Sequence, residues 1–282
     1  MAINKVGIVG SGIMGSGLAE VAARAGLTVV VRSRSQATAD AMVASVSKGL
    51  AKQVEKGRAT EEEAKAIIGR ITAVSDLSAL ADCDLVIESV VEDLDTKKKL
   101  FTELDGIVKA GAIIATNTST LPVIELAMVT KRPELVCGIH FFNPATAMPL
   151  VEVVRPLSAS DSTIEAATAF ATACGKQPVQ VKDRAGFIVN ALLFPYLNNA
   201  IRMLEQGTAN MADIDTAMKG GCNFPMGPFA LLDLVGLDTS LAILDALYAE
   251  FRDPNYAAMP TIRRMVAAGK LGRKTKSGFY DY

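Results

Sequence analysis

A six-residue glycine turn near the N-terminus constrains the fold more than any other feature of this sequence. It reads Gly10-Ser11-Gly12-Ile13-Met14-Gly15 and joins a strand-like apolar run at 5–10 to a helical pattern that ends at Gly26. At such a junction the first glycine permits a tight turn, the second lets a phosphate approach the backbone, and the third lets the helix pack closely on the strand. The N–H groups at the helix start attract phosphate. The turn therefore predicts a dinucleotide-binding site formed by its six residues, with a purely structural turn as the alternative.

Further apolar runs, alternating with helical patterns, extend this strand–turn–helix unit. We expect strands at 27–32, 84–89, 112–116, 135–142 and 150–155, and helices at 36–57, 61–69 and 95–109. Runs that are apolar on both faces are typical of a parallel sheet covered by helices on both sides. The pattern predicts an α/β fold that begins with a doubly wound, Rossmann-type domain.

The character of the chain changes beyond about Gly186, where the strand-like runs stop. The remaining patterns are helical, and loops are marked by Gly220-Gly221, Pro225 and Gly227-Pro228. A polar patch at 180–187 precedes the first long apolar helix of this part. We therefore expect a dinucleotide-binding domain at 1–184 and an all-helical C-terminal domain at 185–282.

Composition excludes several other classes of protein. The chain has 29 Lys and Arg against 30 Asp and Glu, so it lacks the basic excess expected of a binder of nucleic acid or anionic membranes. No apolar run reaches the ~18 residues of a membrane span, and the first residues lead directly into the glycine turn. The four cysteines are widely spaced and there is one histidine, so neither a disulfide framework nor a histidine metal cluster is expected. These features predict a cytoplasmic protein without a metal site.

Two arginines and two serines stand at the end of the second expected strand, in the order Arg32-Ser33-Arg34-Ser35. A carboxylate at this place would bind the ribose hydroxyls of NAD and repel a 2′-phosphate. Guanidinium and hydroxyl groups instead offer hydrogen bonds to that phosphate. The motif predicts NADP as the preferred cofactor over NAD, the alternative being a polar loop whose arginines only face solvent.

The single histidine, His140, follows a short apolar run, and Glu152 lies twelve residues later in the next expected strand. If the intervening loop folds back, the carboxylate can bind one imidazole nitrogen and leave the other for proton transfer near neutral pH. A structural, hydrogen-bonded histidine is the alternative. The spacing by itself does not decide between them.

Six long motifs resemble the 3-hydroxyacyl-CoA dehydrogenase family. They read VIESVVED, ATNTST, IHFFNPATAMPLVEVV, GFIVNALLFPYL, FPMGPFALLDLVGLD and LGRKTKSGFYDY, and they extend from the first domain to the last residue. In length the chain is closest to the stand-alone bacterial members that act on 3-hydroxybutyryl-CoA. The resemblance implies a soluble oxidoreductase of fatty acid metabolism that interconverts acetoacetyl-CoA and (S)-3-hydroxybutyryl-CoA.

The resemblance also implies roles for single residues at the matching positions. His140 would be the general base, or the general acid in the reducing direction, with Glu152 as its orienting partner. Ser119 would contact the substrate oxygen or the thioester, and Asn190 would position the thioester in a cleft between the domains. The positions that match cofactor contacts of the family are Glu92, Lys97, Asn143 and Lys274. Ser33 stands where the family usually has an acidic residue, which again favours NADP.

Substrate and partner expectations follow from the same resemblance. The substrate would be a short-chain 3-hydroxyacyl-CoA or 3-ketoacyl-CoA, and the helical domain would form a homodimer. Lysines at four-residue spacing would line one helix face near the coenzyme A phosphates, or simply form a solvated face: Lys48, Lys52 and Lys56. Two alternatives stay open: the same fold acting on a free hydroxy acid, sugar acid or carrier-bound acyl group, and a non-catalytic cofactor-binding protein.

Overall fold

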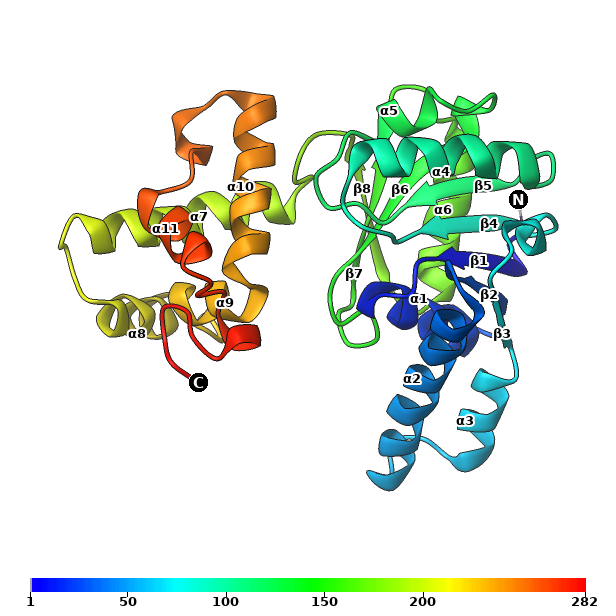
Figure 1. Cartoon of the computed structure of the whole chain (residues 1–282), viewed down its shortest axis with the longest axis horizontal. Helices are drawn as coiled ribbons and strands as arrows, with labels where there is room; N and C mark the ends of the chain where they lie inside the picture. The colour runs from blue at the N-terminus through cyan, green and yellow to red at the C-terminus, as the bar shows by residue number, and fades with distance from the viewer. Residues whose placement is uncertain (1) are drawn as a thin grey trace. The chain divides into compact units, whose positions relative to one another are not determined.

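The computed structural model describes residues 2–282, which divide into one compact unit up to Asp183 and another from Arg184. The first unit is built on a single sheet (Figure 1). Its eight strands are β1 (Lys5–Val9), β2 (Thr28–Arg32), β3 (Ile71–Val74), β4 (Leu85–Glu88), β5 (Ile113–Thr116), β6 (Val136–Phe141), β7 (Leu150–Arg155) and β8 (Gln177–Lys182). They lie in the order β3-β2-β1-β4-β5-β6-β7-β8, and every neighbouring pair is parallel except β6 and β7. The first six strands thus have the order of a dinucleotide-binding sheet.

Helices cover both faces of this sheet. They are α1 (Ile13–Arg24), α2 (Gln36–Glu55), α3 (Glu61–Ile68), α4 (Leu94–Ile107), α5 (Val123–Ala127) and α6 (Asp161–Ala173), with short 3₁₀ turns at Leu77–Leu80 and Pro133–Leu135. Residues of α1, α2 and α6 share one apolar cluster with alternate residues of the strands, such as Ile8, Ile139 and Val153. Successive residues of a strand point to opposite faces of the sheet. His140, next to Ile139, and Glu152, next to Val153, therefore point to the other face. The expected doubly wound α/β fold is confirmed.

Two strands were not expected from the sequence. β3 and β8 are the two edge strands, and four of the six residues of β8 are exposed. An edge strand buries little surface, so it needs no continuous apolar run and leaves a weak signal in the sequence. The segment 180–182, part of the polar patch noted in the sequence, is the end of this strand.

The second unit is entirely helical in its described elements. It contains α7 (Val189–Glu205), α8 (Met211–Cys222), α9 (Pro228–Val235), α10 (Leu237–Phe251) and α11 (Pro260–Ala267), with 3₁₀ turns at Pro254–Tyr256 and Arg273–Thr275. Its core joins apolar residues of α7, α9 and α10, including Phe194, Phe229 and Leu244. The buried carboxylate of Asp233 accepts hydrogen bonds from the N–H groups of Phe279 and Tyr280, and so ties the C-terminal segment to α9. Along residues 2–282, none of the helices has the length and apolar character required to cross a bilayer.

Candidate active site

The glycine turn has the geometry that phosphate binding requires. Gly10 has a φ of +125°, and a Cβ placed on it would lie 2.2 Å from the carbonyl oxygen of Ser89. A Cβ on Gly15 would lie 2.0 Å from the carbonyl oxygen of Gly10, whereas a Cβ on Gly12 would meet nothing within 4 Å. Gly10 and Gly15 thus serve the turn and its packing, and Gly12 keeps an approach to the start of α1 open. These residues fit the pyrophosphate of a dinucleotide.

This difference between the glycines gives a first prediction. Gly12→Ala should leave the melting temperature nearly unchanged, because the new methyl group enters open space and the φ of −76° suits alanine, so that only the small cost of alanine at the N-cap of α1 remains. The methyl group should weaken cofactor binding about tenfold, ~1.4 kcal/mol, because it keeps the pyrophosphate away from the backbone. Isothermal titration calorimetry and thermal unfolding would measure both quantities. The matched variant Gly15→Ala should instead lower the melting temperature, and a stable Gly12→Ala protein with unchanged cofactor affinity would contradict this account of the turn.

A cavity of about 430 Å³ connects the glycine turn with the end of β2. Its lining includes Arg32, Ser33 and Arg34, so the structure brings these residues to the same cavity as Gly10 and Gly12. Ser33 is buried, and its hydroxyl lies 2.9 Å from Ser11 Oγ and 2.6 Å from Thr38 Oγ1. Arg32 donates from Nε to the carbonyl oxygen of Ser75, while Arg34 is exposed. Arg34 is therefore the more available guanidinium for a ligand in this cavity.

His140 and Glu152 face each other because of strand register. They are directly opposite in the antiparallel pair of β6 and β7, and opposite residues project from the same face of a sheet. His140 Nδ1 lies 2.7 Å from Glu152 Oε2, and both side chains are buried. A carboxylate only accepts hydrogen bonds, so Nδ1 is the protonated nitrogen of the neutral imidazole and Nε2 is an acceptor. The strand register therefore gives the imidazole a buried carboxylate partner at Nδ1.

Ser119 meets the other side of the imidazole. It lies in the loop after β5, and its Oγ is 3.1 Å from His140 Nε2. The side chain of Asn117 in the same loop accepts a hydrogen bond from the N–H of Phe141, 2.8 Å away, and so holds the loop to β6. The structure therefore gathers Ser119, His140 and Glu152 at the carboxyl end of the central strands, where ligands bind in open α/β sheets.

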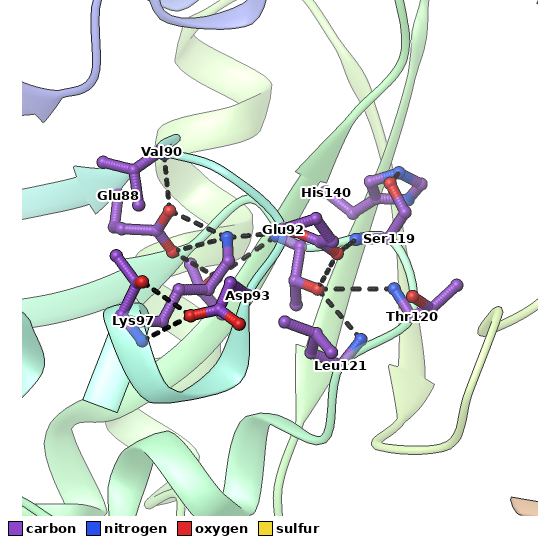
Figure 2. A network of polar contacts seen from close by, with 12 residues as sticks. Glu88, Val90, Glu92, Asp93, Lys97, Ser119, Thr120, Leu121 and His140 are labelled. Atoms are coloured by element: carbon purple, nitrogen blue, oxygen red, sulfur yellow. Dashed lines mark hydrogen bonds and ion pairs between the residues drawn. The ribbon is translucent and has the colours of Figure 1, made fainter. Parts of the chain in front are cut away.

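An ionic network around the buried pair of Lys97 and Glu88 adjoins Ser119 (Figure 2). Lys97 is 1% exposed, and its Nζ lies 2.8 Å from Glu88 Oε1 and 3.0 Å from Glu92 Oε2. Glu92 in turn accepts hydrogen bonds from the Thr118 hydroxyl and from the N–H of Ser119. Burial raises the pKa of Glu92, but the Lys97 ammonium and these hydrogen bonds outweigh it and hold that pKa below its usual value. Glu92 is thus kept ionised next to the loop that carries Ser119.

The other sequence-predicted residues are spread over both units. Asn143 is exposed and lines a small cavity with Ile13 and Gly17 of α1, near the glycine turn. Asn190 is buried in the first turn of α7, and Lys274 binds Asp238 at 2.5 Å, both within the second unit. The three lysines of the proposed coenzyme A face are exposed, two in the C-terminal part of α2 and the third directly after its last residue: Lys48, Lys52 and Lys56. Their roles stay predictions.

Three polar residues that organise the site were not expected from the sequence. Glu88 ends the apolar strand β4, and its side chain is fully buried. Thr118 and Asn117 belong to the ATNTST segment, in which only Ser119 was selected. For Thr118 and Asn117, the signal in the sequence was a cluster of small polar residues directly after a buried strand. For Glu88, an acidic residue at the end of an apolar strand, the sequence contains no such signal.

The fold and the site together define a class of protein. A doubly wound sheet with a phosphate-binding glycine turn, and a histidine–carboxylate pair at the carboxyl ends of its strands, are the features of an oxidoreductase that uses a nicotinamide dinucleotide. Two sequence models match: the "3-hydroxyacyl-CoA dehydrogenase, NAD binding domain" at residues 5–184, and the "3-hydroxyacyl-CoA dehydrogenase, C-terminal domain" at residues 186–282. The chain belongs to the 3-hydroxyacyl-CoA dehydrogenase family.

Individual relatives agree over the full length. The chain is 47% identical to a 3-hydroxybutyryl-CoA dehydrogenase of Mycobacterium tuberculosis, over 100% of this chain and 99% of the relative. It is 44% identical to a 3-hydroxybutyryl-CoA dehydrogenase of Clostridioides difficile, over 99% of each chain. The crystal structure of an (S)-3-hydroxybutyryl-CoA dehydrogenase from Ralstonia eutropha superimposes with a TM-score of 0.97 at 44% identity, covering 100% of this chain and 99% of that one. The family resemblance that the motifs suggested is confirmed.

Proposed function

We propose that this protein is an NADP(H)-linked 3-hydroxybutyryl-CoA dehydrogenase that interconverts acetoacetyl-CoA and (S)-3-hydroxybutyryl-CoA. The observation that carries the proposal is the hydrogen-bonded series Ser119–His140–Glu152 on a dinucleotide-binding sheet. The activity printed in the names of relatives that match over the full length supports the substrate class. The intact histidine–carboxylate pair disfavours a non-catalytic role.

The chain's own residues supply the acid–base part of this reaction. When bound, the nicotinamide exchanges a hydride with the carbon that carries the substrate oxygen. In the reducing direction, protonated His140 donates from Nε2 to the 3-keto oxygen; in the oxidising direction, neutral His140 accepts the hydroxyl proton there. Glu152 stabilises the imidazolium and fixes its orientation through Nδ1. Ser119 Oγ, next to Nε2, adds a hydrogen bond to the same substrate oxygen.

The preference for NADP rests on the end of β2. Arg34 is exposed at the cavity that also contains the glycine turn, and no acidic side chain lines this cavity within the described residues. A guanidinium there would bind a 2′-phosphate through charge-assisted hydrogen bonds. Asn143, near α1, and Glu92 would border the nicotinamide half, and Lys274 remains a proposed cofactor contact from the second unit.

The remaining assignments concern substrate binding and assembly. Asn190 would position the thioester, and Lys48, Lys52 and Lys56 would bind coenzyme A phosphates. In the second unit, several large apolar side chains are exposed, which supports its role in a homodimer: Leu192, Met203, Phe224 and Leu234. The protein would act in the cytoplasm, in fatty acid metabolism.

Initial rates with acetoacetyl-CoA and each reduced cofactor test the proposal directly. We expect turnover with NADPH at a kcat/KM at least about tenfold above that with NADH, a difference of ~1.4 kcal/mol in binding the transition state. Free acetoacetate and an acyl-carrier thioester serve as comparison substrates and should be poor. Equal or faster turnover of either would favour the alternative substrates, and no NADPH oxidation with any short 3-ketoacyl-CoA would favour the non-catalytic alternative.

A further inference from the structure

The ionic network near His140 contains two carboxylates but only one ammonium group. The carboxylates of Glu88 and Glu92 both bind the single ammonium of Lys97, at 2.8 Å and 3.0 Å. Glu88 is also hydrogen-bonded by the N–H of Val90 at 2.6 Å and by the hydroxyl of Thr116 at 2.7 Å. With the Glu88 side chain 0% exposed and that of Lys97 1% exposed, neither charge can be compensated by water. The ammonium is therefore essential to a network that holds two acidic groups.

Glu92 connects this buried pair to the loop after β5, which carries Ser119. Its Oε2 binds Lys97, while its Oε1 accepts hydrogen bonds from the Thr118 hydroxyl and, at 2.9 Å, from the N–H of Ser119. The Thr118 oxygen accepts further hydrogen bonds from the N–H groups of Thr120, at 3.3 Å, and Leu121, at 2.9 Å. The turn 118–121 is thus built around one ionised carboxylate (Figure 2).

We propose that Lys97 is a positioning residue of the active site: it acts through Glu92 to hold the turn 118–121 so that Ser119 meets His140. Glu88 anchors the ammonium from the opposite side. The assignment rests on the proposed function, and the expected cofactor contact of Lys97 stays a prediction.

The charges of this network predict how substitutions of Lys97 and Glu88 change the pKa of Glu92. In Lys97→Met, Glu92 loses its cation, while the partial burial of its side chain remains and raises its pKa. The negative charge of Glu88, which shares the same ammonium, acts in the same direction by like-charge repulsion. The neighbouring Lys98 is paired with Glu125, and among residues 2–282 Glu92 has no ion pair other than the one with Lys97. As the pH falls through the raised pKa, Glu92 takes up a proton, becomes a poorer acceptor and releases the turn. Removing the negative charge of Glu88 as well should relieve this effect.

Steady-state kinetics against pH test this pattern. Lys97→Met should lower kcat for acetoacetyl-CoA at neutral pH by about tenfold or more, with a new acid limb in the kcat profile. Glu88→Gln/Lys97→Met should recover at least about fivefold of that loss, a coupling within the range for residues of one network. The matched control Lys98→Met, on the same helix but half-buried and paired with Glu125 instead of Glu92, should behave like the unmodified protein. A double variant no more active than Lys97→Met would overturn the proposal.

A second readout does not depend on turnover. His140 is the only histidine, so protein labelled with ¹⁵N-histidine gives the NMR signals of one imidazole. In the unliganded protein, Lys97→Met should shift the Nε2 signal and add an inflection at the acid limb, and Lys98→Met should do neither. If Lys97→Met does not fold, Glu92→Ala, whose side chain is 41% exposed, should give the same shift of Nε2 because the turn loses its acceptor. A Nε2 signal that is unchanged in the folded variant refutes the proposal, whereas an unmodified protein without dehydrogenase activity refutes only the proposed function.

Discussion

His140→Gln is expected to lower kcat for the reduction of acetoacetyl-CoA by ~10²–10⁴-fold, the usual contribution of a positioned acid–base group. Glutamine has a similar size and can still hydrogen-bond to Glu152, but its amide does not exchange a proton at neutral pH. The affinity for NADPH should change by no more than about twofold, because the glycine turn and the end of β2 do not contact His140. Stopped-flow or steady-state assays would give kcat, and fluorescence titration would give the dissociation constant of NADPH.

The size of this effect decides between two roles of the histidine. A decrease of tenfold or less, with a normal circular dichroism spectrum, would remove His140 from proton transfer and leave it a structural residue. The pH profile of the unmodified protein offers an independent check, since any histidine titration of activity between about pH 5 and 8 has one candidate in this chain. That titration should vanish in His140→Gln.

Ser33→Asp/Arg34→Asn should reverse the cofactor preference. The ratio of kcat/KM for NADPH to that for NADH should fall by about 10²-fold, because a charge-assisted hydrogen bond is worth ~1.5–3 kcal/mol and the new carboxylate repels the 2′-phosphate. The site can accommodate the carboxylate, since the hydroxyls of Ser11 and Thr38 already lie 2.9 Å and 2.6 Å from Ser33 Oγ and can donate to it. Initial rates with both cofactors measure the ratio.

The matched control for this variant is Arg58→Asn, which removes one exposed arginine that does not line the cavity. Its ratio should equal that of the unmodified protein. The interpretation of Arg34 is wrong if the unmodified protein already uses NADH as efficiently as NADPH, or if the double variant keeps its preference.

Much of the fold could be predicted from the sequence because the central strands are buried on both faces. Strands such as β1 and β4 consist almost entirely of apolar residues, and a chain segment of this kind has few other stable environments. The edge strand β8 was missed because four of its six residues are exposed, and β3 was missed because it is only four residues long. Their pairing depends on the neighbouring strand and not on their own composition.

The site was predictable to a smaller extent. The spacing of His140 and Glu152 suggested a pair, but the reason for their contact is the antiparallel register of β6 and β7, which no local pattern specifies. The burial of Lys97 was not predictable either, because the sequence does not reveal that Glu88 and Glu92 lie on either side of its ammonium. Charged residues enter a protein interior only with partners, and those partners are set by tertiary structure.

The most direct test of the acid–base assignment is a crystal structure of the protein with NADP⁺ and acetoacetyl-CoA, a pair that cannot react by hydride transfer. We predict that His140 Nε2 lies within hydrogen-bonding distance, ~2.6–3.2 Å, of the 3-keto oxygen, with Nδ1 still bound to Glu152. An imidazole that points away from this oxygen, with no water molecule between them, would contradict the mechanism.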